Sequence, residues 1–169
     1  MGRLRVVCLS PFSRRTGLAV LLAIAAAAPA RADITGFIGA NTTPANRQVR
    51  GGAIGAGLLI VGFELEYAFT PDDPAASAPS LTTGMANVLF QTPLAILGFQ
   101  PYFTSGTGIY HETLDTHADT GIGLNTGGGV KISLLGPIRL RVDYRVFKLG
   151  SGALNSPAHR VYAGLNLKF

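Results

Sequence analysis

Two segments of the chain place ionisable side chains at every second position. In residues 63–69, Glu64 and Glu66 alternate with large apolar residues. Residues 138–147 repeat the pattern, and their charged positions are Arg139, Arg141, Asp143 and Arg145. Successive side chains of a β-strand point to opposite faces, so each segment gathers its charges on one face. Charges gathered in this way can form an ion-selective constriction, or they can pair with one another and fill an interior.

A second group of polar side chains could in principle bind a metal ion. His111, Asp115, His117 and Asp119 lie close together in the sequence, and imidazole and carboxylate are ordinary metal ligands. Their spacing matches no rigid scaffold, and a mobile polar loop over residues 112–119 explains them equally well. We therefore expect no metal site and no cofactor.

Two glycine-rich runs, residues 51–57 and 121–129, invite comparison with phosphate-binding loops. Such loops need a strand before them and a helix after them, together with a Lys-Ser/Thr pair or a following acidic residue. No helical pattern follows either run. Glycine in a strand often marks a bend or a bulge, and we interpret both runs as devices for strand curvature.

The first 32 residues have the features of a secretory signal peptide. Residues 1–15 carry four arginines and no acid, and residues 17–28 form an uncharged apolar stretch. A small-x-small motif then ends at Ala32, which predicts cleavage before Asp33. Residues 33–169 retain nine basic and nine acidic residues, so the basic character belongs to the leader. A nucleic-acid-binding domain needs an excess of Lys and Arg on its folded body, and this class is excluded.

Apolar residues alternate with polar or small ones throughout residues 33–169, and no segment shows helical periodicity. The pattern predicts an all-β fold of eight strands. Short turns at residues 59–61, 93–96 and 135–137 alternate with longer polar connections, which is typical of an up-and-down barrel. The expected strands are residues 34–42, 50–59, 63–69, 84–92, 97–110, 122–132, 138–147 and 160–169.

A soluble ligand-binding barrel would have the same strand count with its two faces exchanged. Placing the charges of residues 138–147 toward lipid would cost about 2–4 kcal/mol for each arginine near the bilayer midplane. The signal peptide, the few charges and the strand lengths, close to the roughly 9–11 residues of a membrane-spanning strand, favour a membrane protein. The prediction is therefore an eight-stranded antiparallel up-and-down transmembrane β-barrel with its apolar face toward lipid.

The sequence resembles the small eight-stranded outer-membrane β-barrel family (OmpA/OmpX/OmpW-like proteins) over all of residues 33–169. Residues 160–169 carry the most specific match, and residues 101–108 and 140–145 look like the family's fifth and seventh strands. The resemblance implies a C-terminal assembly signal that the barrel assembly machinery reads. Its residues are Val161, Ala163, Leu165, Leu167 and Phe169.

In such a barrel the charged faces would point into the lumen and form a layer. The expected members are Glu64, Glu66, Lys131, Arg139, Arg141, Asp143, Arg145 and Lys168. Because basic residues outnumber acids in this set, an anion-selective constriction is one interpretation. The other is a salt-bridged plug, which we favour because an eight-stranded barrel has an interior just wide enough for its own side chains.

Some small outer-membrane barrels are lipid-modifying enzymes. Here His159 could act as a base for Ser151 or Ser156, but the His-x-Ser-Asn signature of lipid A deacylases is absent, and no acid on the last strand is placed to orient the imidazole. We expect no enzymatic activity.

The sequence thus predicts a signal peptide at residues 1–32 and an outer-membrane β-barrel at residues 33–169, in a Gram-negative-type bacterium. Its expected role is structural or surface-interactive, through four outward loops that identify no extracellular partner. Its expected contacts are outer-membrane lipid and lipopolysaccharide. The alternative is a narrow porin-like channel for small apolar or anionic solutes, which the glycines of residues 123–129 would accommodate in the lumen. A third possibility is a soluble periplasmic barrel.

Overall fold

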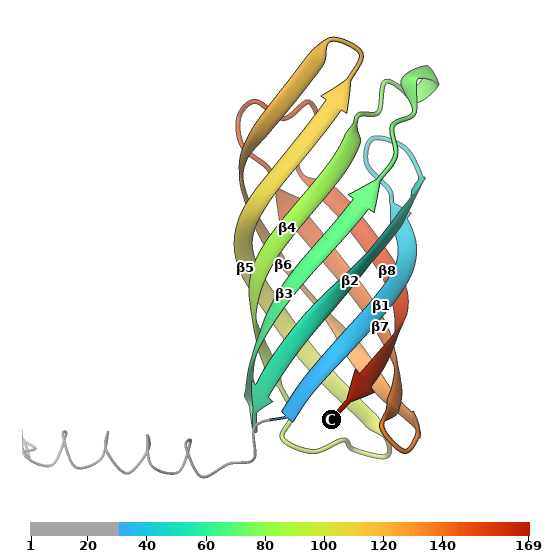
Figure 1. Cartoon of the computed structure of the whole chain (residues 1–169), viewed down its shortest axis with the longest axis vertical. Coiled ribbons are helices and arrows are strands. Elements are labelled where there is room, and N and C mark those ends of the chain that lie inside the picture. The colour runs from blue at the N-terminus through green and yellow to red at the C-terminus, as the bar shows by residue number, and fades with distance from the viewer. Residues whose placement is uncertain (1–30) are drawn as a thin grey trace, which may run out of the picture.

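The computed structural model describes residues 31–169, which form one closed β-barrel (Figure 1). Its eight strands are antiparallel and follow one another in sequence order, and β1 pairs with β8 to close the sheet. The predicted all-β, eight-stranded up-and-down barrel is confirmed. The strands are β1 (Arg31–Asn41), β2 (Arg47–Leu58), β3 (Val61–Thr70), β4 (Ser80–Gln91), β5 (Phe99–Leu114), β6 (His117–Leu135), β7 (Ile138–Lys148) and β8 (Ala158–Lys168).

The strand connections differ in character at the two ends of the barrel. At one end, which we call the turn end, residues 59–60, 92–98 and 136–137 join successive strands. At the opposite loop end, the connections are residues 42–46, 71–79, 115–116 and 149–157. A short 3-10 helix, η1 (Pro74–Ala76), belongs to the second of these. Within residues 31–169, no helix is long and apolar enough to span a membrane.

The connection between β5 and β6 is much shorter than the sequence pattern predicts. Instead of a loop over residues 112–119, both strands continue, and Glu112 pairs with Asp119 and Leu114 with His117. Only residues 115–116 turn, with Asp115 in the left-handed region at φ 51°. Asp is among the residues that tolerate this conformation, which permits the tight turn. The predicted mobile polar loop is therefore wrong, and the segment is an extended hairpin.

The predicted signal peptide falls almost entirely on residues 1–30, which lie outside the described residues. The predicted cleavage bond between Ala32 and Asp33 lies within β1, close to its start. The register between β1 and β8 begins with Asp33 opposite Lys168. Cleavage would remove the two backbone hydrogen bonds between Ala32 and Phe169, and it would leave the remaining register intact.

Large apolar side chains cover the outside of the barrel, and polar side chains fill the inside. Leu65 and Ile122, for example, are 59% and 73% exposed, whereas Glu64 and Glu66 are each 3% exposed. A water-soluble ligand-binding barrel would have the opposite arrangement, with polar side chains outside and an apolar interior. An exterior of this kind is stable against hydrocarbon rather than water.

Two glycines of β6 leave space for large side chains inside the barrel. A Cβ atom at Gly129 would lie closest to the backbone oxygen of Val142 and 2.6 Å from the hydroxyl oxygen of Tyr102. One at Gly127 would lie closest to the backbone oxygen of Tyr144 and 3.0 Å from Cγ of Arg145. Glycine is needed at both positions because any larger residue would displace these neighbours. The glycine-rich face of β6 is thus occupied by side chains from the adjacent strands.

We predict that Gly129→Val destabilises the barrel because the new side chain overlaps Tyr102. Overpacking of this kind typically costs 1–3 kcal/mol, so the free energy of unfolding should fall by about 2 kcal/mol. Guanidinium titration of the purified protein in detergent, followed by circular dichroism, measures the change. Gly84→Val is the matched control because a Cβ atom at Gly84 meets no atom within 4 Å. Equal unfolding midpoints for the two variants would contradict the prediction.

Candidate functional site

Three arginines and three carboxylates meet in the middle of the barrel. Glu64 and Glu66 project inward from β3, and the other four side chains come from β7 and β8. None of the six is more than 3% exposed. We call them the central cluster: Glu64, Glu66, Arg141, Asp143, Arg145 and Arg160.

Each carboxylate of the central cluster contacts two arginines. Glu64 accepts hydrogen bonds from Arg141 and from Arg145, the latter at 2.9 Å. Asp143 also accepts from Arg141 and Arg145, at 2.9 and 3.1 Å. Glu66 forms ion pairs with Arg145 and Arg160, both at 3.1 Å. The charges balance, and the pairs link β3 to β7 and β8 on the other side of the lumen.

Two tyrosines connect the central cluster to the rest of the wall. The Tyr102 hydroxyl of β5 donates a hydrogen bond to Asp143 and accepts one from Nε of Arg141 at 2.7 Å. The Tyr162 hydroxyl of β8 lies 3.0 Å from Asp143 and 3.2 Å from Glu66. The ring of Phe37 stacks on Tyr162 at a centroid distance of 4.1 Å. These contacts fix the position of the carboxylates between the arginines.

Neutral polar side chains extend the network to further strands. Asn125 donates to Asn87 at 2.7 Å, and Asn87 donates to Glu64 at 3.4 Å. Arg160 donates to Asn41 at 3.2 Å and to Thr83 at 3.1 Å. The interior at this height is therefore a continuous hydrogen-bonded layer.

A second, smaller ionic group lies nearer the turn end. Lys131 of β6 donates to Asp33 of β1 at 2.9 Å, and Arg139 of β7 donates to the same oxygen at 3.1 Å. Arg139 also donates to Gln100 at 3.1 Å and to Asn166 at 2.8 Å. We call Asp33, Lys131 and Arg139 the turn-end cluster. It has two basic side chains and one acid.

The predicted charge layer is thus divided into two groups. The strands are staggered, so residues at corresponding positions of different strands lie at different heights along the barrel axis. Lys131 and Arg139 belong to the turn-end cluster, and Lys168 makes no ion pair within residues 31–169. The predicted excess of bases concerns the whole set, and the structure places its unbalanced members at the turn end, because three bases face three acids in the central cluster. Sequence reasoning missed Arg160 and Asp33, although Arg160 shares the inward face of its strand with Tyr162.

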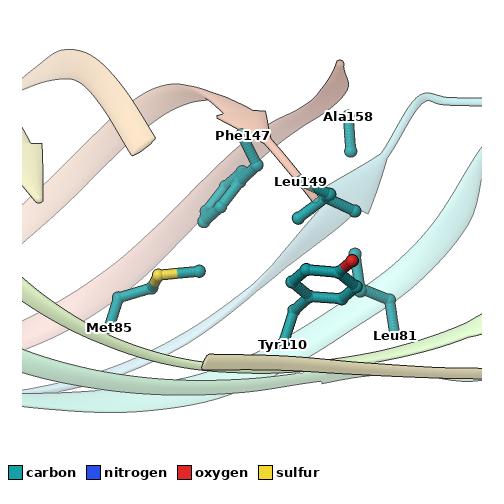
Figure 2. Packing of buried hydrophobic residues seen from close by; sticks show 6 residues of the cluster. All are labelled: Leu81, Met85, Tyr110, Phe147, Leu149 and Ala158. Carbon is teal, nitrogen blue, oxygen red and sulfur yellow. The ribbon is translucent and has the colours of Figure 1, made fainter. Parts of the chain in front are cut away.

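The loop end of the lumen is closed by an apolar cluster. Figure 2 shows Met85 and Tyr110 pointing across the lumen toward Phe147 and Leu149. Leu81 and Ala158 complete the group. Leu81, Phe147 and Ala158 lie at or next to the loop-end termini of their strands, and Leu149 directly follows β7. The lumen therefore has a paired ionic layer in its middle and an apolar layer between this layer and the loops.

The four residues considered for a metal site point in different directions. His111 faces outward and forms a hydrogen bond with Thr120 at 2.7 Å, whereas Asp119 accepts one from Tyr110 at 2.5 Å. His117 lies 3.5 Å from Glu112, and Asp115 is in the turn. In the described part of the chain, no three metal-ligating side chains gather at one place.

His159 is not placed to activate either serine of the last loop. Its Nδ1 atom lies 2.7 Å from the Tyr144 hydroxyl on the outer face of the barrel. Ser156 donates instead to the backbone oxygen of Leu149 at 3.4 Å, and its own oxygen accepts from the Leu149 amide at 3.1 Å. Among residues 31–169, neither Ser151 nor Ser156 forms a side-chain hydrogen bond with His159.

The residues of the predicted assembly signal share one face of β8 and its end. Val161 and Leu165 are 44% and 59% exposed, and Phe169 is 76% exposed. Ala163 and Leu167 are likewise exposed on the outer surface. The signalling role itself stays a prediction.

No protein-family model and no curated protein matches the sequence. Among solved structures, the chain is similar to the N-terminal β-barrel domain of Pseudomonas aeruginosa OprF, with 17% identity and a TM-score of 0.64 over 82% of this chain and 97% of that one. Neisserial surface protein A aligns with 18% identity and a TM-score of 0.62, over 83% and 96% of the two chains.

The outer membrane enzyme PagL also shares the architecture, with 9% identity and a TM-score of 0.52 over 80% of this chain and 98% of that one. These structures include an enzyme, so the likeness defines the architecture and not an activity. The chain has the fold of the small eight-stranded outer-membrane β-barrel proteins.

Proposed function

We propose that the chain is a non-enzymatic outer-membrane protein whose lumen is closed and whose role is structural or surface-interactive. The observation that carries the proposal is the inversion of the barrel, with an apolar outer face and a central cluster in which every carboxylate is paired with arginines. An apolar outer face of this extent would be unstable in water, and a bilayer covers it.

The closed lumen follows from how the interior is filled. Buried arginines and carboxylates are stable only when they are paired and hydrogen-bonded, and each carboxylate of the central cluster contacts two arginines. The glycine-lined space that would have accommodated solutes is occupied by Tyr102 and Arg145. These contacts support the salt-bridged plug over the channel.

The surface role is supported by how the loops are held at the loop end. The buried Arg47 donates hydrogen bonds to backbone oxygens of Pro79, Pro71 and Thr43, and so joins two loops. Glu112 accepts a hydrogen bond from the Leu154 amide at 2.6 Å and so holds the last loop. Loops positioned on a rigid barrel are a common location for binding function.

The partners that we propose are outer-membrane lipid and lipopolysaccharide around the apolar wall, and the barrel assembly machinery during biogenesis. For the machinery, the outward positions of Val161, Ala163, Leu165, Leu167 and Phe169 leave this face of β8 available. Export by a cleaved signal peptide is part of the same proposal.

We predict that the protein is found in the washed outer-membrane fraction and migrates differently in SDS gels before and after boiling. A barrel closed by hydrogen bonds between β1 and β8 has no free edge, so SDS leaves it folded until it is heated. A soluble protein in the periplasmic fraction, with no shift on boiling, would refute the proposed location.

We predict that the purified protein shows no stepwise conductance in planar bilayers, because the central cluster and the apolar layer obstruct the lumen in series. A known porin reconstituted in the same way is the positive control. Regular conductance steps that disappear in Arg141→Ala would show instead that the charged layer is a selective constriction.

We predict that Arg141→Ala destabilises the barrel strongly, because it leaves Glu64 and Asp143 with one arginine each. Breaking a buried ion pair from one side costs about 3–5 kcal/mol, and guanidinium unfolding in detergent measures the loss. Lys148→Ala is the matched control because Lys148 is exposed on the same strand. If both variants unfold at the same denaturant concentration, the central cluster does not stabilise the fold.

A further inference from the structure

A cavity of about 370 Å³ opens at the turn end of the lumen, below the central cluster. Its two sides differ in chemistry. Lys131, Arg139 and Lys168, from β6, β7 and β8, line one side. Leu59, Leu89 and Leu94, from β4 and the neighbouring connections, line the other.

The cationic side of this cavity lacks enough carboxylates to balance it. Asp33 accepts from both Lys131 and Arg139 through one oxygen. Glu64 is the other acid that lines the cavity, and it is already held by two arginines of the central cluster. Lys131 is only 3% exposed, so bulk water compensates its charge poorly. The predicted signal cleavage would remove Arg31 from the lining but none of these cations.

The apolar side continues onto the rim of the cavity. Leu94 is 71% exposed and Leu97, in the same connection, is 93% exposed. A ligand that enters from the turn end therefore meets apolar side chains first and basic side chains farther in.

We propose that this cavity binds a small amphiphilic anion, an organic carboxylate with a short hydrocarbon tail. The carboxylate lies against Lys131, Arg139 and Lys168, and the tail packs on Leu59, Leu89 and Leu94. A volume of about 370 Å³ is within the range of small-molecule sites. An inorganic anion would leave the apolar side unused, and a neutral solute would leave the cations without a new partner.

The central cluster lies beyond the inner end of this cavity, so the ligand is bound there rather than passed through the barrel. The inference concerns a binding site and goes beyond the proposed structural role. Its test is separable from that role, because binding is measured on the purified barrel whatever its cellular location.

The experiment is a titration of the full mature barrel in lipid nanodiscs, followed by amide chemical shifts in NMR. Hexanoate is the probe, hexanol carries the same tail without charge, and inorganic phosphate carries charge without a tail. We expect saturable shifts with hexanoate at Gln100 and Gly57, which line the cavity. Hexanol and phosphate should bind at least about tenfold more weakly, because hexanol loses one charge-assisted contact and phosphate loses the apolar contact.

Variants of each side test the two halves of the proposal. Lys131→Met and Lys168→Met should each weaken hexanoate binding, by about tenfold for Lys131→Met. Lys168→Met tests the site even if Lys131→Met fails to fold, because Lys168 has no ion pair within residues 31–169. Leu94→Ser should weaken hexanoate binding and leave phosphate binding unchanged. Lys148→Met is the matched control on the outer face and should change neither.

Three results would overturn the proposal. Hexanoate could give no saturable shifts at the cavity, phosphate could bind as tightly as hexanoate, or hexanoate binding could be the same in Lys131→Met, Lys168→Met and the wild type. The second result would identify a site for inorganic anions only. None of the three bears on whether the barrel lies in the outer membrane.

Discussion

The ion pairs between β3 and the two last strands are the interaction on which the rest of the structure depends. A charged side chain in a water-poor interior must be paired, and each carboxylate of the central cluster meets two arginines. A shift of β3 by one residue would turn Glu64 and Glu66 toward the outside. The same ion pairs therefore favour the observed register of β3, and they place paired side chains across the middle of the lumen.

The size of these side chains explains the glycines. Arg145 and Tyr102 need space inside a narrow barrel, and β6 provides it at Gly127 and Gly129. Tyr102 in turn donates to Asp143, so a backbone feature of one strand positions an acid of the next. The β6 glycines that suggested open space for solutes thus lie against the side chains of Tyr102 and Arg145.

The sequence pattern predicted the face of each residue but not its height. Alternation of apolar and charged residues identifies which side chains share a face, and this is why the eight strands and the inward position of Arg141 could be predicted. The height of a residue along the barrel axis depends on the stagger of neighbouring strands. The sequence of a single strand does not encode this stagger. The division between the central cluster and the turn-end cluster, and the partnership of Asp33 with Lys131, therefore needed the structure. The β5–β6 hairpin was missed for a related reason, since its cross-strand pairs lie among polar residues typical of loops.

The two ends of the lumen are unlike each other, and this difference limits what the barrel can do. Toward the loops, apolar side chains such as Met85 and Phe147 meet across the lumen. Toward the turns, the cavity stays open and carries basic side chains, of which Lys131 and Arg139 share the carboxylate of Asp33. Between the two ends lies the central cluster, in which each carboxylate contacts two arginines. If the central cluster closes the inner end as we propose, a molecule that reaches the basic residues from the turn end leaves by the same way, and this half of the barrel acts as a binding pocket rather than a pore.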